Sequence, residues 1–470
     1  MPLRHFFLFA TLLVTLLPAA ASAEPLTAGI AVVDVTPPVP YRMSGYFRER
    51  LSTGILDPLY AKVVVFRQGD TSAALVFVDM VGISHDVSSR TRELAAQQTG
   101  IPVAHIAIAA THSHTGPLYF GALRAHFHKK TIEDQGRDIY ETVDYPTQLV
   151  EKLAAAIKQA QAALQPVDLA AGYAQEKRLS FNRRFHMKNG SVRFNPGYKN
   201  PNIIRAAGPI DPEVGLISFA KPGEKKPFAA VVSFALHLDT VGGTKYSGDY
   251  PKHLQDKLQA EYGEDFLSLF GAGTCGDINH VDVTAPKRRT APEIGGLLSE
   301  SVSQGLKSLT PIKAPELAVR QTVYHAPLQK YTADQTQASA KAMDSVADGK
   351  VPFLKRVETY KIAALALRGG DTIPLEIQAF RLSKDVAIVT LPGEVFVEFG
   401  MAIKHASPFK TTLVIELTND APGYIPTQKA FAEGSYETVN SRVQTGSGEK
   451  MVDAAIGLLR ELGGERANER

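Results

Sequence analysis

Three residues able to bind a metal each follow directly after a run of apolar residues typical of a buried strand. His112 follows His105–Ala110, His237 follows Ala229–Leu236, and Glu394 lies just beyond Val386–Leu391. Ligands bind at strand ends in open α/β sheets. A catalytic zinc site needs a few nitrogen or oxygen ligands and one open position, so this set predicts a metal site at strand ends.

His112 belongs to a His-Ser-His triplet whose second histidine is His114. On an extended segment, residues two apart point to the same side, so both imidazoles can face one cavity. One would then bind the metal while the other accepts a proton during the reaction. The alternation alone leaves open which histidine has which role.

Apolar runs along the rest of the chain predict the elements that position these residues. Ala61–Phe66 and Ser72–Val78, separated by Gln68-Gly69-Asp70, predict a β-hairpin. Further strands are predicted at Ala28–Val35, Leu169–Tyr173, Val214–Phe219, Phe266–Phe270, Ile373–Arg381 and Thr412–Leu417, and helices at Val87–Gln98, Tyr145–Ala163, Tyr250–Tyr262, Pro292–Leu306 and Lys450–Leu462. This mixture predicts an α/β fold with a central mixed β-sheet and flanking helices. The more charged region Ala314–Gly370 is expected to be peripheral.

The first residues predict export. Arg4 and His5 precede the apolar run Phe6–Leu17, and Ala21-Ser22-Ala23 supplies a cleavage site of small residues. The run is too short to cross the roughly 30 Å of bilayer hydrocarbon, so we expect residues 1–23 to be a cleaved signal peptide. No cysteine for lipid attachment follows the run, and a periplasmic or secreted product is expected.

Composition narrows the classes of function. The chain has 470 residues and a formal net charge of +3, without a dense basic block along the sequence, so nucleic-acid binding has no electrostatic support. Cys275 is the single cysteine, which excludes an intramolecular disulfide and a multi-cysteine zinc site. With no low-complexity linker, residues 24–470 are expected to form one catalytic domain.

The segment Thr111-His112-Ser113-His114-Thr115-Gly116-Pro117 resembles the Thr-His-Thr-His-Ser-Gly-Pro signature of the neutral, non-lysosomal ceramidases. Asn182-Arg183, Phe234-Ala235-Leu236-His237 and Leu391-Pro392-Gly393-Glu394 are similar to that family's Asn-Arg, Phe-Ala-x-His and Pro-Gly-Glu motifs, in the same order. The resemblance extends from about Gly29 to Tyr436.

The resemblance implies a zinc-dependent hydrolase that cleaves the N-acyl amide bond of a ceramide-like lipid or a related amide. The implied zinc ligands are His112, His237, Glu394 and Tyr424. Zinc would lower the pKa of the water it binds and polarise the scissile carbonyl.

The same resemblance assigns roles around the metal. It implies that His114 is the second, non-ligand histidine, acting as general base and contacting substrate. Arg183 would bind substrate, and Tyr436, twelve residues after Tyr424, would help to hold the oxyanion. Asp249 corresponds in spacing to a family aspartate, which implies a carboxylate that orients His237.

The sequence departs from the family pattern at Gly276-Asp277-Ile278-Asn279-His280, where ceramidases have Gly-Asp-x-Ser-Pro-Asn. Asn279 stands at the serine position and is expected to be a catalytic residue. Its amide can form a hydrogen bond to the substrate but cannot be acylated. Neighbouring Cys275 is expected to pack and not to act as nucleophile. No immunoglobulin-like domain is expected after Tyr436, and Leu118–Tyr145 has no counterpart with a known role.

Three other functions fit parts of the pattern. An esterase or amidase could use the same zinc site on a non-lipid substrate. A metal-dependent phosphatase would usually need more carboxylates and often two metals. A non-catalytic binding protein is suggested by Asn279 but opposed by retention of all four implied ligands. The expected partners are a small-molecule or lipid amide and, at the periphery, a membrane, but no nucleic acid.

Overall fold

The protein has a mixed α/β fold with its strands divided among several sheets. The computed structural model describes residues 24–348 and 351–464, so the predicted signal peptide lies outside the described residues. Two sheets have five strands and one has four. Each of these combines antiparallel pairs with one parallel pair. The predicted α/β class with mixed sheets is confirmed, although three sheets take the place of one central sheet.

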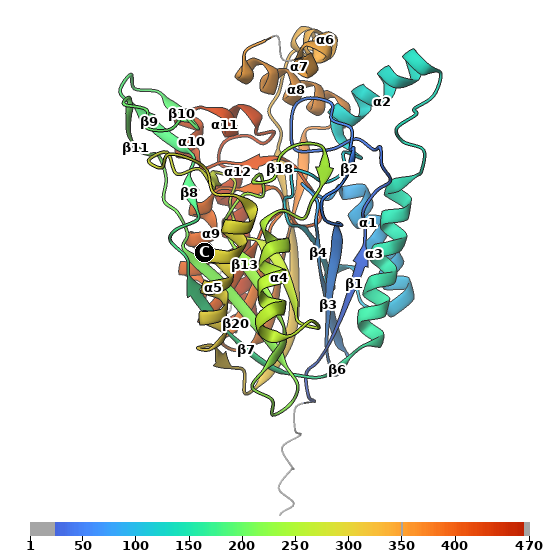
Figure 1. Ribbon diagram of the computed structural model, residues 1–470, viewed down its shortest axis with the longest axis vertical. Coiled ribbons are helices and arrows are strands. Elements are labelled where there is room, and N and C mark those ends of the chain that lie inside the picture. The colour runs from blue at the N-terminus through green and yellow to red at the C-terminus, as the bar shows by residue number, and fades with distance from the viewer. Residues whose placement is uncertain (1–23, 349–350, 465–470) are drawn as a thin grey trace, which may run out of the picture.

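The first sheet carries the predicted hairpin. It contains β1 (Thr27–Asp34), β3 (Tyr60–Gln68), β4 (Thr71–Val78), β5 (Ile106–Ala110) and β6 (Gln165–Pro166), in the order β5-β4-β3-β1-β6. The hairpin register runs from Ala61 opposite Val78 to Gln68 opposite Thr71. Helices α1 (His85–Thr99) and α3 (Tyr145–Ala162) bury their apolar faces on one side of this sheet and lie on the right in Figure 1.

The second and third sheets complete the body. The second has the order β15-β13-β12-β7-β17 and packs against α4 (Tyr250–Tyr262) and α5 (Ala291–Leu306). Its strands are β7 (Asp168–Gln175), β12 (Glu213–Ala220), β13 (Pro227–Phe234), β15 (Leu267–Ala272) and β17 (Thr310–Pro311). The third has β18 (Pro315–Pro327), β19 (Thr372–Ser383), β20 (Val386–Thr390) and β22 (Thr411–Ile415), and packs against α9 (Val397–Ala406) and α12 (Ser447–Gly463).

One apolar core joins all three sheets. Phe66 of β3, Phe219 of β12 and Phe380 of β19 are all buried in it. On β3, Val64 and Phe66 face this central core, whereas Val63 and Val65 face the helices. Successive residues of a strand point to opposite faces, so a continuous apolar run is what a strand buried on both faces requires.

The expectation that Ala314–Gly370 is peripheral is wrong for its first part. β18 is a strand of 13 residues paired with β19 along its length, and its Leu317 and Val319 enter the central core. The exposed charged residues Glu316 and Arg320 lie next to buried Leu317 and Val319 along the strand. They raised the charge of the region, so its buried residues were not recognised from the sequence. The rest forms α6 (Ala333–Lys341), α7 (Met343–Asp348) and α8 (Phe353–Arg368) at the top of Figure 1.

Smaller elements surround the strand ends near this top. A ribbon of β9 (Arg184–Met187), β10 (Val192–Phe194) and β11 (Ile203–Ala206) projects from the body in Figure 1, and α2 (Gly121–Gln135) packs near α7 and α8. The remaining short elements are β2 (Gly54–Ile55), β8 (Phe181–Asn182), β14 (Lys245–Tyr246), β16 (Ile278–Asn279), β21 (Glu394–Val395), β23 (Tyr424–Ile425), α10 (Gln428–Glu433), α11 (Tyr436–Asn440) and the 3-10 helix η1 (Val103–His105). Within the described ranges, no helix combines the length and apolarity that a bilayer crossing requires.

Candidate metal centre

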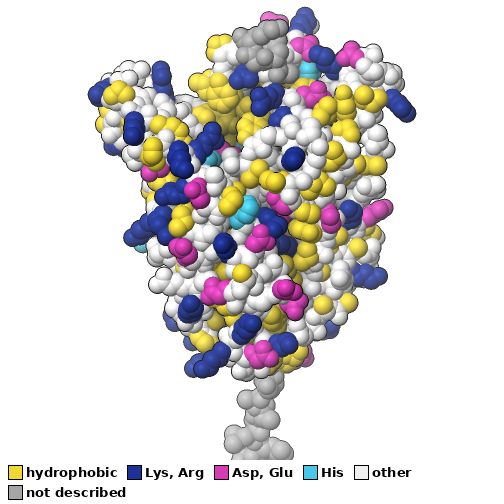
Figure 2. Space-filling view, viewed as in Figure 1, with side chains coloured by type: hydrophobic (Ala, Val, Ile, Leu, Met, Phe, Trp, Pro, Cys, Tyr) yellow, Lys and Arg dark blue, Asp and Glu magenta, His cyan; other side chains and the backbone are white. Residues whose placement is uncertain are grey.

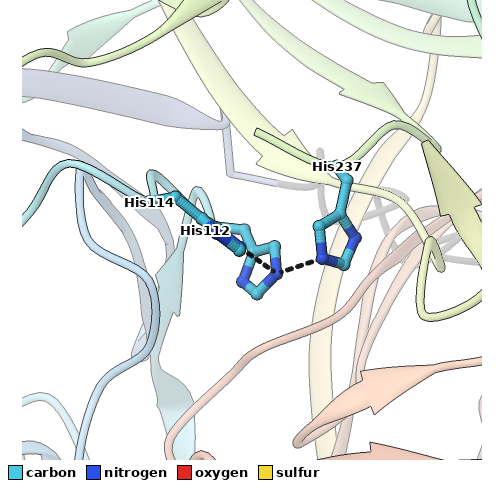
Figure 3. A group of neighbouring side chains, drawn as sticks. All are labelled: His112, His114 and His237. Atoms are coloured by element: carbon cyan, nitrogen blue, oxygen red, sulfur yellow. Dashed lines mark hydrogen bonds between the residues drawn. The ribbon is translucent and has the colours of Figure 1, made fainter. Parts of the chain in front are cut away.

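Three histidine side chains converge beyond the ends of β5 and β13. The ligand nitrogens available on His112, His114 and His237 lie within 4.8 Å of one another. Figure 3 shows these three side chains side by side. His112 Nε2 is 2.9 Å from His237 Nε2 and 3.4 Å from His114 Nε2. The two strands belong to different sheets, so the packing of one sheet on the other creates this cluster.

The backbone at His112 departs from the extended geometry that the sequence pattern predicted. Its φ is 81°, in the left-handed region that non-glycine residues seldom adopt. Its amide donates to the Met80 carbonyl at 2.8 Å, which ties the turn to the end of β4. A strained turn, and not strand alternation, therefore directs both His112 and His114 into one cavity.

The hydrogen bonds of the two buried histidines fix which ring nitrogen carries the proton. His112 Nδ1 lies 2.8 Å from the Val81 carbonyl and His237 Nδ1 lies 3.1 Å from the Cys275 carbonyl. A carbonyl only accepts, so we assign a proton to each Nδ1. The two Nε2 lone pairs then face each other at 2.9 Å, which is unfavourable unless a cation lies between them. This arrangement fits a metal ion.

The electrostatic surroundings keep the imidazoles of His237 and His114 neutral. Burial, and then His112 and Arg183, lowers the pKa of His237 well below its ordinary value. Burial, and then His112, lowers the pKa of His114 to about 3. Neutral imidazole is the form that binds a metal.

The carboxylate of Glu394 lies close to the Nε2 atoms of His112 and His237. Its Oε2 lies 3.5 Å from His112 Nε2 and 3.7 Å from His237 Nε2, and it is buried with no hydrogen-bond partner among the described residues. Burial raises the pKa of Glu394, but His112, Tyr424 and Arg183 outweigh it and hold that pKa below the ordinary value. An ionised carboxylate with an unsatisfied buried oxygen is suited to bind a cation.

Tyr424 is brought beside Glu394 by strand pairing. In the parallel β21–β23 pair these two residues are direct partners, and both line one pocket with His112 and His114. Burial, and then Glu394, raises the pKa of Tyr424 well above its ordinary value. The structure thus gathers the four implied ligands, but it also groups His114 with the other two histidines, which makes His114 a further candidate ligand.

Two solved structures resemble this chain in fold. No protein-family model and no curated protein sequence matches the chain. A crystal structure of neutral ceramidase from Pseudomonas aeruginosa matches with a TM-score of 0.71 at 18% identity, covering 95% of this chain and 76% of that one. The chain has the neutral ceramidase fold. A structure described as ceramidase complexed with C2 matches with a TM-score of 0.69, the same identity and the same coverage.

Arg183 holds a fixed positive charge behind the histidines of this ceramidase fold. Its Nη1 lies 3.3 Å from His237 Nε2, its Nε donates to Glu437 Oε1 at 2.9 Å, and its Nη2 donates to the Gly276 carbonyl at 2.6 Å. The guanidinium also lies over the Tyr424 ring, 5.4 Å from its centroid. Arg183 is therefore anchored by the protein, with its charge directed at His237.

Tyr436 lines the pocket, and its hydroxyl lies 3.5 Å from that of Tyr424. Burial, and then Glu394, raises the pKa of Tyr436, so the phenol keeps its proton. The remaining wall is largely apolar and aromatic: Phe47, Leu118, Phe120, Leu123 and Tyr360. Part of that wall comes from the predicted Leu118–Tyr145 insertion, to which the sequence had assigned no role.

Asn279 is placed away from this pocket wall. It is fully buried in β16, its Nδ2 donates to Asn195 Oδ1 at 2.9 Å, and its Oδ1 accepts from the Val281 amide at 3.0 Å. These contacts hold neighbouring loops together. Among the described residues, no hydrogen bond links Asn279 to the histidine cluster, and its predicted catalytic role stays a prediction.

Cys275 is buried, and its thiol donates to Glu416 Oε1 at 3.0 Å. Burial, and then Glu416, raises the pKa of Cys275 well above its ordinary value, so the thiolate needed for nucleophilic attack is disfavoured. Its contact agrees with the expected packing role.

The predicted role of Asp249 is wrong. Its carboxylate accepts from the amides of Thr240, Val241 and Tyr250 and caps α4, whereas the Nδ1 partner of His237 is the Cys275 carbonyl. Its φ of 61° turns the chain so that the side chain folds back onto its own loop. Sequence spacing carries no information about such a turn.

A carboxylate that the sequence reasoning missed lies near the histidines. Asp239, two residues after His237, pairs with buried His280, with Oδ1 and Nδ1 2.9 Å apart. Burial raises the pKa of Asp239, but His280, His237 and His114 hold it well below its ordinary value. The sequence signal that could have identified Asp239 was its position, two residues after the predicted ligand His237.

A second group, His128, Asp138 and Glu141, also has the spacing of a metal site. Its carboxylates are already paired: Arg42 Nη1 lies 2.5 Å from Asp138 Oδ2 and 3.0 Å from Glu141 Oε1, and Arg124 also contacts Glu141. We interpret this group as an ion-pair network that ties α2 to the loop after it.

Proposed function

We propose that the protein is a zinc-dependent hydrolase that cleaves the N-acyl amide bond of a ceramide-like lipid. The observation that carries this proposal is the pair of unprotonated Nε2 atoms of His112 and His237, 2.9 Å apart, beside the unsatisfied Oε2 of Glu394. His112, His237, Glu394 and Tyr424 would hold the metal. When bound, zinc would supply the Lewis acidity that activates water and polarises a carbonyl.

The other residues of the pocket would act directly on the substrate. His114 lines the pocket with its Nε2 3.4 Å from His112 Nε2, and it would accept a proton from the attacking water. Tyr436 keeps its phenolic proton and can donate it in a hydrogen bond to the oxyanion that forms on the carbonyl. The guanidinium of Arg183 would add positive charge near that oxyanion.

The wall of the pocket supports an apolar acyl group as part of the substrate. Its aromatic and aliphatic side chains would exclude water from a fatty chain, whereas a polar substrate would leave them unsatisfied. The solved relatives in fold include one described as ceramidase complexed with C2, which supports a lipid amide.

The test is hydrolysis of a fluorescent ceramide by protein purified without chelators, together with its metal content. We expect close to one zinc per chain and turnover of the ceramide that exceeds turnover of soluble esters. Ester hydrolysis alone would favour a zinc esterase on non-lipid substrates. Less than about a tenth of an equivalent of metal would contradict the metal site.

We further propose that residues 1–23 direct export and that residues 24–470 act as one catalytic domain. The basis is the sequence pattern of the apolar run and its small-residue cleavage site. Expression in a bacterium with N-terminal sequencing of the periplasmic or secreted product tests this, with Glu24 as the expected first residue.

A further inference from the structure

One segment of the chain is strongly basic, although the whole protein is nearly neutral. No Asp or Glu occurs between Glu176 and Asp211, while Lys and Arg recur throughout. This segment contains β9, β10 and β11, which form an antiparallel ribbon. We call residues 184–206 the basic ribbon. Its cations are spaced along the sequence and form no dense block, and acidic residues elsewhere balance its charge in the whole chain.

The cations of the basic ribbon fall into two groups. Arg184 is buried and paired with Glu433 and Glu437, so its charge is used inside the protein. Four others are exposed: Lys188, Arg193, Lys199 and Arg205. None of these four forms an ion pair with any residue in the described ranges. Figure 2 shows Lys and Arg side chains gathered on the lobe at upper left, where Figure 1 places the ribbon.

Apolar side chains are exposed among these cations. Ile204 of β11 is 60% exposed and Tyr198, in the turn before it, is 39% exposed. Phe353 and Leu354 at the start of α8 are also exposed, and the Phe353 ring stacks on Phe194 of β10 at 6.3 Å. The exposed apolar start of α8 therefore lies against the ribbon. Cations beside exposed aliphatic and aromatic groups are typical of surfaces that enter the headgroup region of a bilayer.

The basic ribbon is in direct contact with the candidate site. The ring of Phe194 lies 4.8 Å from that of Tyr436, which lines the pocket, and 5.1 Å from the guanidinium carbon of Arg183. A surface that holds the ribbon would thus lie beside the mouth of the pocket. A lipid amide could then pass from that surface into the pocket over a short path.

We propose that the basic ribbon binds the surface of an anionic lipid bilayer. Charge complementarity supports this occupant, because unpaired Lys and Arg attract anionic headgroups. Exposed Ile204 favours lipid over nucleic acid, since a phosphate backbone offers no place for an aliphatic side chain. The connection of this surface to substrate supply rests on the proposed function, but the binding itself does not require turnover.

The experiment is co-sedimentation of the protein with vesicles of phosphatidylcholine alone or with phosphatidylglycerol added, at low and high salt. We expect binding to the anionic vesicles that weakens with salt. Each Lys or Arg near an anionic surface contributes about five-fold in affinity, so the double variant Lys199→Gln/Arg205→Gln should lose about 25-fold. Ile204→Ser should weaken the binding that remains at high salt.

The control is Lys225→Gln/Lys226→Gln, which removes the same charge from an exposed turn between β12 and β13. It should bind like the unaltered protein. Equal binding by all variants, absent binding to anionic vesicles, or tight binding to duplex DNA with none to vesicles would each overturn the proposal. Hydrolysis of a soluble short-chain amide without vesicles should be unchanged in Lys199→Gln/Arg205→Gln; absence of that activity in the unaltered protein would count against the proposed function only.

Discussion

His112 and His237 present their unprotonated Nε2 atoms to each other across 2.9 Å, and each ring is held in that orientation by a backbone carbonyl. The carbonyls belong to Val81 and Cys275, in the loops that follow β4 and β15, which are strands of two different sheets. The ligand geometry therefore depends on the packing between these sheets. This relationship explains how a candidate metal site can form in a chain with a single cysteine.

The first prediction separates the two histidines of the triplet. His112→Ala should lose the metal, whereas His114→Ala should keep it and lose about 10² to 10⁴ in rate, the usual contribution of a general base. Zinc content and turnover are measured on the same preparations. His405→Ala, at the exposed end of α9, is the control and should alter neither. Loss of metal from His114→Ala would make His114 a ligand, as its place in the histidine cluster allows.

The second prediction concerns the charge of Glu394. Glu394→Gln keeps the shape of the side chain but removes the charge from the unsatisfied Oε2. Metal affinity should fall by at least about 10- to 100-fold, the loss typical even of residues that only orient a ligand. Competition with a chelator measures it. Glu398→Gln, on the first turn of α9, is the control; equal affinities for both variants would exclude Glu394 from the ligand set.

The sequence predicted most strands and the main histidines because those signals are local. The runs of β3, β4 and β13 are mostly apolar over their own length, and His112 and His237 lie two and three residues after the ends of β5 and β13. Features made by distant segments escaped prediction. The pocket wall needs Phe47 and Tyr360 to meet, Asp239 needs His280, and Asp249 turns away through its own backbone conformation. Such contacts depend on loop geometry, which the residue types do not specify.

The third prediction tests the hydroxyl of Tyr436. Tyr436→Phe should retain the metal and the fold but lower kcat by about 10² to 10³, as removal of one oxyanion donor does. Tyr360→Phe makes the same change elsewhere on the pocket wall, where the hydroxyl accepts from Arg442 at 3.3 Å, and should have a much smaller effect. Steady-state kinetics on ceramide measure both. Equal losses of kcat in the two variants would indicate that both hydroxyls only stabilise the structure of the pocket wall.

The fourth prediction is that Cys275→Ser keeps most activity. The thiol is buried, donates to Glu416 and is held protonated because burial raises its pKa. A serine hydroxyl can make the same hydrogen bond, so the free energy of unfolding should change by no more than about 1 kcal/mol. Activity and thermal unfolding of the metal-loaded protein are compared. Loss of turnover with metal and stability retained would identify the thiol as the nucleophile.

The last prediction concerns stability and pH at Asp277. Burial raises its pKa to about 6, although Val397 N–H and Asn182 Nδ2 donate to its two oxygens. The folded protein therefore keeps a proton on Asp277 in a range where the unfolded chain has lost it. The contribution of Asp277 to the free energy of unfolding should fall as pH rises from about 4 to about 6, and should stay level above that. The total fall should be about 1.4 kcal/mol for each unit by which the pKa is raised.

Asp277→Asn removes this titration and should flatten the fall of stability between pH 4 and 6 relative to the unaltered protein. The slope is the readout, because the amide also loses a hydrogen bond and is less stable at every pH. Denaturant unfolding at a series of pH values measures it. Glu300→Gln, at an exposed position on α5, is the control and should leave the slope unchanged. Parallel stability curves for Asp277→Asn and the unaltered protein would mean that Asp277 is already ionised in the folded state at pH 4, with its two hydrogen bonds outweighing the effect of burial.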